Sequence, residues 1–121
     1  MGVVYVRKLL LLFVFLLVPS VCAADINDGV NALGRGNYEL ALVEFRAGAE
    51  EGDVSAQNFL AYTYTMLEDY KEAYAWYHLS AECGSIDADI DREVLSRKMT
   101  TDQIEKARLL GTDYLERYCV K

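Results

Sequence analysis

Apolar residues recur at helical spacing along most of the chain beyond residue 24. Two stretches, residues 38–56 and residues 70–88, align with each other; their matched residues lie at i, i+3, i+7 and i+11 and are followed by a glycine. The matches are Tyr38 with Tyr70, Ala41 with Ala73, Phe45 with Tyr77, Ala49 with Ala81, Glu50 with Glu82, Gly52 with Gly84 and Ala56 with Ala88. This spacing places the matched residues on one face of a helix, and the glycine suits a left-handed C-cap.

Further apolar stripes predict the remaining helices. One stripe comprises Ala56, Phe59, Leu60, Tyr64 and Leu67, and the last comprises Ile104, Ala107, Gly111, Tyr114, Leu115 and Tyr118. Asp69 with Glu72, and Thr100 with Gln103, have the spacing of capping boxes, which mark helix starts. We predict six helices, over residues 26–34, 38–51, 55–67, 70–83, 86–97 and 101–118.

The alternation of small and aromatic residues predicts how these helices pack. Ala41, Ala49, Ala73 and Ala81 allow close approach of a neighbouring backbone, and Phe45, Trp76 and Tyr77 fill the spaces between. The fold class is therefore all-α, a short α–α solenoid of about three helix pairs. Three pairs are close to the minimum for a solenoid, so a homodimer is also considered.

Residues 1–23 have the pattern of a secretory signal peptide. Arg7 and Lys8 precede an apolar run over residues 9–18, and small residues follow up to Ala23. We expect cleavage after Ala23 or after Ala24, which leaves one helical repeat domain over residues 24–121. The apolar run is too short for a spanning helix, so we expect no stable membrane insertion after cleavage and an exported protein, periplasmic or secreted.

Charge narrows the class of partner. Residues 24–121 contain ten basic and nineteen acidic residues, a net charge of −9. Phosphate backbones and anionic lipid headgroups repel such a domain, so nucleic acid and membrane surfaces are poor candidates.

One stretch carries a family resemblance. Leu60, Ala61, Tyr64, Tyr70, Ala73, Tyr77 and Ser80 stand at the intervals of the tetratricopeptide repeat. The chain more closely resembles the Sel-one-like subfamily of bacterial exported type, on residues Asp69, Tyr70, Ala73, Trp76, Tyr77, Ser80, Ala81, Glu82, Gly84 and Ala88. It departs from that pattern where residues 65–68 replace a Gly-rich turn and where Ala61 replaces Gly.

The resemblance implies a binding groove. Positions that face the concave side in this family are occupied here by Ser55, Asn58, Tyr62, Thr65 and Met66, and the first helix extends the face with Asn27 and Asn31. A tyrosine with amide neighbours can stack on a ligand and bond to its backbone. The alternative is a merely polar outer face.

Cys83 lies at the predicted end of one helix and Cys119 just beyond the end of another, and in a solenoid these two helices run side by side in the same direction. An oxidising compartment permits a disulfide between them if their Cα atoms come within about 7 Å. Two free thiols are the alternative, with Cys83 partly buried against the following helix.

The sequence offers little for catalysis or metal binding. Asp87, Asp89 and Asp91 alternate as in a calcium loop, but Arg92 replaces the required Gly and Lys98 stands where a Glu is needed. His78 is the sole histidine; it has no second ligand at a useful spacing, and we expect it at a partly exposed helix position beside Tyr74. We therefore predict no catalytic residue, no metal and no cofactor.

These observations favour a non-catalytic adaptor or scaffold that binds a protein or peptide partner through its groove. Two alternatives remain. Some cysteine-rich secreted relatives of the Sel-one-like family are linked to penicillin binding or lactam hydrolysis, but they carry a repeated Cys pair that is missing here. A short solenoid can also associate with itself as a structural protein.

Overall fold

The computed structural model describes residues 25–119, and the predicted signal peptide lies outside them. Within this range the secondary structure is entirely helical. The helices are α2 (Ile26–Gly34), α3 (Tyr38–Glu50), α4 (Val54–Met66), α5 (Tyr70–Glu82), α6 (Ile86–Ser96) and α7 (Thr101–Tyr118). Each begins and ends within one position of its predicted bounds.

A local signal that recurs at a constant interval divides the chain into these helices. Each turn from α2 to α6 contains a residue with positive φ followed directly by an N-cap residue. The positive-φ residues are Gly36, Gly52, Glu68 and Gly84, and the N-caps are Asn37, Asp53, Asp69 and Ser85. The predicted repeat therefore consists of two helix-and-turn units of equal length.

The caps explain why the helices start where they do. The Asp69 carboxylate accepts a hydrogen bond from the amide of Glu72 at 3.3 Å, which satisfies an amide left free at the helix start. At Thr100 the capping box is complete, because the side chains of Thr100 and Gln103 each accept a hydrogen bond from the other residue's backbone amide.

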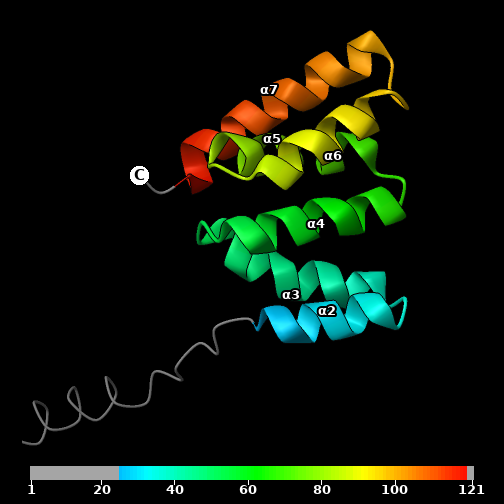
Figure 1. The fold of residues 1–121 in the computed structure, drawn as a ribbon, viewed down its shortest axis with the longest axis vertical. Coiled ribbons are helices and arrows are strands. Elements are labelled where there is room, and N and C mark those ends of the chain that lie inside the picture. Colours follow the sequence, from blue (N-terminus) through cyan, green and yellow to red (C-terminus); the bar gives the residue numbers. More distant parts are fainter. Residues whose placement is uncertain (1–24, 120–121) are drawn as a thin grey trace, which may run out of the picture.

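The helices form the predicted solenoid. Figure 1 shows them stacked from α2 and α3 through α4, α5 and α6 to α7 at the opposite end. Successive helices from α2 to α6 pack against each other, whereas α7 packs mainly along α5. The side of α6 away from α5 thus has no helix laid along it among the described residues.

Aromatic rings and small residues interlock in the core, as the alternation predicted. Phe45, Leu60 and Trp76 are completely buried, beside alanines such as Ala41 and Ala73. The indole of Trp76 contacts the rings of two tyrosines of α7, with centroid distances of 4.6 Å to Tyr114 and 5.6 Å to Tyr118. Burial of this cluster joins α7 to the solenoid.

Two residues of a predicted core stripe are exposed instead. Phe59 and Leu67 of that stripe keep 37% and 38% of their accessible surface. The Phe59 ring stacks on Phe45 of α3 with one face, at a centroid distance of 5.2 Å, and turns the rest outward. The sequence assigned too many residues of α4 to the core, because neighbouring helices cover only part of the circumference of α4.

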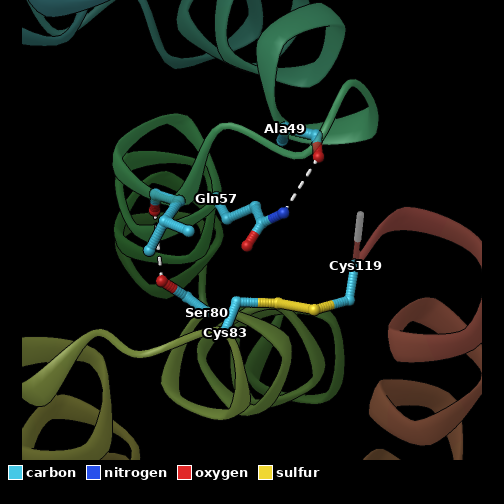
Figure 2. The surroundings of a disulfide bond; sticks show 6 residues. Ala49, Gln57, Ser80, Cys83 and Cys119 are labelled. Carbon is cyan, nitrogen blue, oxygen red and sulfur yellow. Dashed lines mark hydrogen bonds between the residues drawn. A yellow bond between two sulfur atoms is a disulfide. The ribbon is translucent and has the colours of Figure 1, made fainter. Parts of the chain in front are cut away.

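Cys83 and Cys119 are joined in a disulfide, with their Cα atoms 6.4 Å apart (Figure 2). Both residues occupy C-cap positions, of α5 and α7 respectively, where the backbone leaves the helix and can approach more closely than helix axes do. The bond ties the end of the last helix to the centre of the solenoid.

Candidate functional site

A pocket lies between α4 and α6, with Tyr77 of α5 at its base. Its volume is about 150 Å³, and its walls are formed by Tyr62, Thr65, Tyr77, Asp91, Val94, Leu95 and Lys98. Tyr77 and Leu95 are almost fully buried and form the floor, whereas Tyr62 and Val94 keep 45% and 52% of their surface and form the rim. The pocket is thus an apolar hollow with polar groups at its edges.

The outer face of α4 continues the rim of this pocket. The 13 residues of this helix include no charged side chain. Its exposed positions include Ser55, Phe59, Tyr62 and Met66, which lie at i, i+4, i+7 and i+11 and therefore form one stripe along the helix. The helix thus shows two aromatic rings and a methionine to solvent without any charge beside them on the same helix.

A second exposed stripe runs along α6. Ile86, Ile90 and Val94 lie at i, i+4 and i+8 and keep 78%, 57% and 52% of their surface. The buried side of the same helix is formed by Ala88 and Leu95 instead. Helix α6 therefore has two apolar faces, of which the fold covers one.

Two aspartates of α6 form no ion pair within residues 25–119, and one of them lines the pocket. Of the three alternating aspartates, Asp89 pairs with Arg92, but Asp87 and Asp91 form no ion pair with any described residue. Partial burial and the nearby charge of Asp87 raise the pKa of the Asp91 carboxyl. Lys98, the one cation of the pocket lining, lies 6.0 Å from the centre of the Tyr70 ring.

The polar groups inside the pocket suit recognition better than reaction. Burial raises the pKa of Tyr77 to about 12, although the Thr65 hydroxyl beside it acts in the opposite direction. The Tyr77 hydroxyl therefore stays protonated at neutral pH. The Thr65 hydroxyl donates to the Ala61 carbonyl at 3.0 Å, as a helical threonine often does. Asp91 is the carboxylate of the pocket lining, and it forms no hydrogen bond to either hydroxyl among the described residues.

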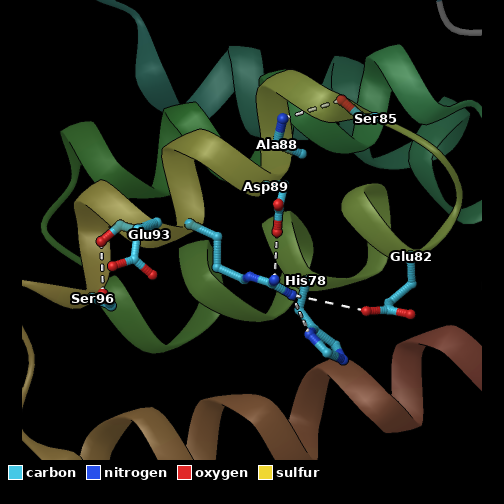
Figure 3. Close-up of polar contacts among 8 residues, drawn as sticks. His78, Glu82, Ser85, Ala88, Asp89, Glu93 and Ser96 are labelled. Atoms are coloured by element: carbon cyan, nitrogen blue, oxygen red, sulfur yellow. Dashed lines mark hydrogen bonds and ion pairs between the residues drawn. The ribbon is translucent and has the colours of Figure 1, made fainter.

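His78 belongs to a separate polar cluster that links α5 to α6 (Figure 3). Its Nδ1 lies 2.8 Å from the guanidinium of Arg92, which also pairs with Asp89 and Glu82. Since a guanidinium only donates, Nδ1 is an acceptor and the imidazole is neutral. Burial, and then the charge of Arg92, lower the pKa of His78. The sequence predicted His78 beside Tyr74, and the two rings stack with their centroids 6.5 Å apart. The contact of His78 with Arg92 of α6 was not predicted.

The residues predicted for the groove divide into three groups. Tyr62 and Thr65 line the pocket, and Ser55 and Met66 lie on the same outer face of α4. Asn58 is half-buried, with its Oδ1 shielded from solvent and without a hydrogen-bond partner among the described residues.

The asparagines of α2, the third group, do not join the pocket. Asn27 is exposed, and Asn31 lines a different hollow of about 300 Å³ between α2 and α3. A wider hollow of about 480 Å³ lies on α3 and is lined by that helix alone, so it is an open surface and not a cleft between helices.

The sequence interpretation missed the contribution of α6 to the site. Asp91, Val94, Leu95 and Lys98 form one wall of the pocket, yet only Asp91 was considered as a ligand, for calcium. A signal was present, because Ile86, Ile90 and Val94 form a stripe in addition to the one through Ala88 and Leu95. Two apolar stripes on one helix are the pattern expected of a helix with neighbours on both sides.

Among residues 25–119 no group of three or more His, Cys, Asp or Glu side chains is arranged to hold a metal ion. In the same range, no helix combines the length and the apolar character that crossing a membrane requires. Comparisons with protein-family models, with curated proteins and with solved structures gave no match.

Proposed function

We propose that this protein is a non-catalytic binding module that recognises a protein or peptide partner in the groove between α4 and α6. The observation that carries this proposal is the exposed apolar surface of the two helices, Phe59, Tyr62 and Met66 on α4 and Ile86, Ile90 and Val94 on α6, of which Tyr62 and Val94 line the pocket. Contiguous apolar surface with a polar rim is typical of interaction sites, since leaving it in water costs free energy.

The pocket supports binding without catalysis. Its tyrosine stays protonated, and its carboxylate has neither a partner base nor a nucleophile at hydrogen-bond distance among the described residues. The sequence pattern between Asp69 and Ala88, together with helix-and-turn units of constant length, supports membership of the Sel-one-like type of repeat protein.

The disulfide supports the proposal that the protein works after export. Disulfides persist in oxidising compartments and are rare in the reducing cytosol. A bond between Cys83 and Cys119 therefore fits the leader pattern of residues 1–23, which favours the periplasm or the extracellular space.

The groove assignment can be tested by crosslinking in cells. A photoreactive benzoylphenylalanine at position 62 should give adducts with a partner, whereas the same group at Leu109, which is 56% exposed on α7, should not. Val94→Asp, placed in the opposite wall of the pocket, should remove the adducts of position 62. Equal crosslinking from positions 62 and 109, or adducts that survive Val94→Asp, would show that the groove is not the binding site.

A further inference from the structure

We infer that the occupant of the α4–α6 groove is a cationic amphipathic helix of a partner protein. This inference rests on the proposed function, because it assigns a chemistry to the partner that the groove is proposed to bind. It is carried by the length of the apolar stripes, by the pocket between Tyr62 and Val94 and by two carboxylates, Asp87 and Asp91, that form no ion pair with any described residue.

The shape of the groove matches a helix. The apolar stripe of α6 runs from Ile86 to Val94, which is about 12 Å at the helical rise of 1.5 Å per residue. The stripe from Phe59 to Met66 on α4 is about 10 Å long at the same rise. The pocket lies between Tyr62 and Val94, one residue of each stripe, and apolar stripes of this length can accept two to three turns of an amphipathic helix, whose anchors recur at i, i+3, i+4 and i+7.

The pocket provides the anchor point. A cavity of about 150 Å³ in a protein core holds one benzene-sized group, so the space between Tyr62 and Val94 can take one large apolar side chain. The floor formed by Tyr77 and Leu95 is already desolvated. Energetically important contacts concentrate in such pockets, because water is excluded from them on binding.

The unpaired carboxylates decide the charge of the partner. Asp87 and Asp91 are one turn apart on α6, and both lack an ion-pair partner among the described residues, while Asp89 on the other side of the helix is paired with Arg92. Helix α4 contributes no charge to the facing wall. A Lys or Arg on the partner would relieve the repulsion between the two carboxylates and would be steered toward them.

A second copy of the same chain fits this groove less well. Residues 24–121 carry a net charge of −9, so two copies repel each other. On α7 the cations Lys106, Arg108 and Arg117 already pair with acidic residues of the same helix. Partners richer in Lys and Arg than this chain are favoured.

The test uses the protein purified in the form that accumulates in cells and two fluorescent model helices of equal length, each about four turns. One is made of Leu and Lys in amphipathic order, and the other has Glu in place of each Lys. Fluorescence anisotropy should show binding of the Leu/Lys helix and at least tenfold weaker binding of the Leu/Glu helix. Tyr62→Ala should weaken binding of the Leu/Lys helix about tenfold, as loss of an aromatic anchor commonly does.

Matched variants separate the charge from the groove. Asp91→Asn should weaken binding of the Leu/Lys helix about threefold to tenfold and reduce its salt dependence. Glu93→Gln changes the charge of the same helix equally but lies outside the pocket lining, so it should change the affinity less than about twofold. Leu109→Ala on α7 is the corresponding apolar control.

Each other outcome overturns the inference and locates the error. Equal binding of the two helices, or equal effects of Asp91→Asn and Glu93→Gln, would disprove the cationic partner. If Tyr62→Ala still weakened binding in that case, the groove would remain the binding site. Binding that Tyr62→Ala does not weaken would disprove the groove itself. A dimer in sedimentation equilibrium that Tyr62→Ala dissociates would identify a second copy as the occupant.

Discussion

Helices α4 and α7 both bury one face in the solenoid, but their outer faces meet solvent in opposite ways. Helix α7 has seven charged side chains, and three ion pairs at i, i+3 or i+4 run along it. Helix α4 has no charged side chain, and its outer face shows Phe59, Tyr62 and Met66.

The difference separates a helix that closes one end of the solenoid from a helix whose outer face is left free to bind. A terminal helix must present a face that water can solvate, and the charged surface of α7 does so. Helix α4 lies in the middle of the stack, where the fold does not require an apolar outer face. Phe59 packs one side of its ring on Phe45, but Tyr62 and Met66 keep 45% and 44% of their surface exposed, and we propose that this face binds a partner.

The largest effect is expected at the aromatic cluster that joins α7 to α5. Trp76→Ala should lower the free energy of unfolding by about 3–5 kcal/mol, because the side chain is completely buried against Tyr114 and Tyr118. Tyr62→Ala on α4 should change it by no more than about 0.5 kcal/mol. Urea unfolding followed by circular dichroism measures both.

The two substitutions must also differ in binding. Tyr62→Ala should weaken binding of the Leu/Lys helix about tenfold at unchanged stability. If Tyr62→Ala proved as destabilising as Trp76→Ala, Tyr62 would be a packing residue and the contrast between α4 and α7 would fail.

Loss of the disulfide should be the next largest effect. Cys83 and Cys119 are separated by 36 positions in the sequence, so reduction of their bond should lower the free energy of unfolding by about 3–4 kcal/mol on the chain-entropy model. Hydrogen exchange should then speed up most in α7 and least in α3 and α4. A Cys83→Ser/Cys119→Ser variant should show the same lower stability and no response to reductant. Uniform exchange over all helices would contradict a local role in holding α7.

A smaller effect, of opposite sign, is expected at the turn that ends α4. Glu68 has a φ of 60°, where the equivalent turns have glycine. Glu68→Gly should raise the free energy of unfolding by about 0.5–1 kcal/mol, because relief of the left-handed strain outweighs the added chain entropy. Gly84→Ala at the equivalent position should lower it by about 1 kcal/mol. Thermal unfolding checks both signs, and binding to the α4 face should not change.

The smallest expected effect is a pH dependence of stability that arises from His78, which lies beneath α7. His78 faces Arg92 of α6, Glu82 of its own helix and Arg108 of α7, and burial is the main cause of its lowered pKa. Because the unfolded chain then binds the proton more readily than the folded one, His78 favours folding above pH 6.5 and loses that contribution as the pH falls. His78→Gln should flatten the stability profile between pH 7 and pH 5. NMR titration of this single histidine gives its pKa directly, and a pKa above 6.5 would contradict the prediction.

Much of the architecture could be predicted because its signals are local. The N-caps Asn37, Asp53 and Asp69 and the positive-φ residues before them fix helix bounds through hydrogen bonds within a few residues. The site was predicted in part. Tyr62 and Thr65 lie in the pocket, but its α6 wall and the separate position of Asn31 were not foreseen, because both depend on contacts between helices.

Within residues 25–119 the sequence by itself determined the number and bounds of the helices, since periodicity and caps act over a few residues. Only the tertiary structure decided which apolar stripes are covered. Helix α7 packs along α5 and not along α6, and α4 has neighbours on part of its circumference, so Ile90, Val94 and Phe59 stay at the surface. Burial depends on which helix arrives from elsewhere in the chain, and no local pattern contains that information.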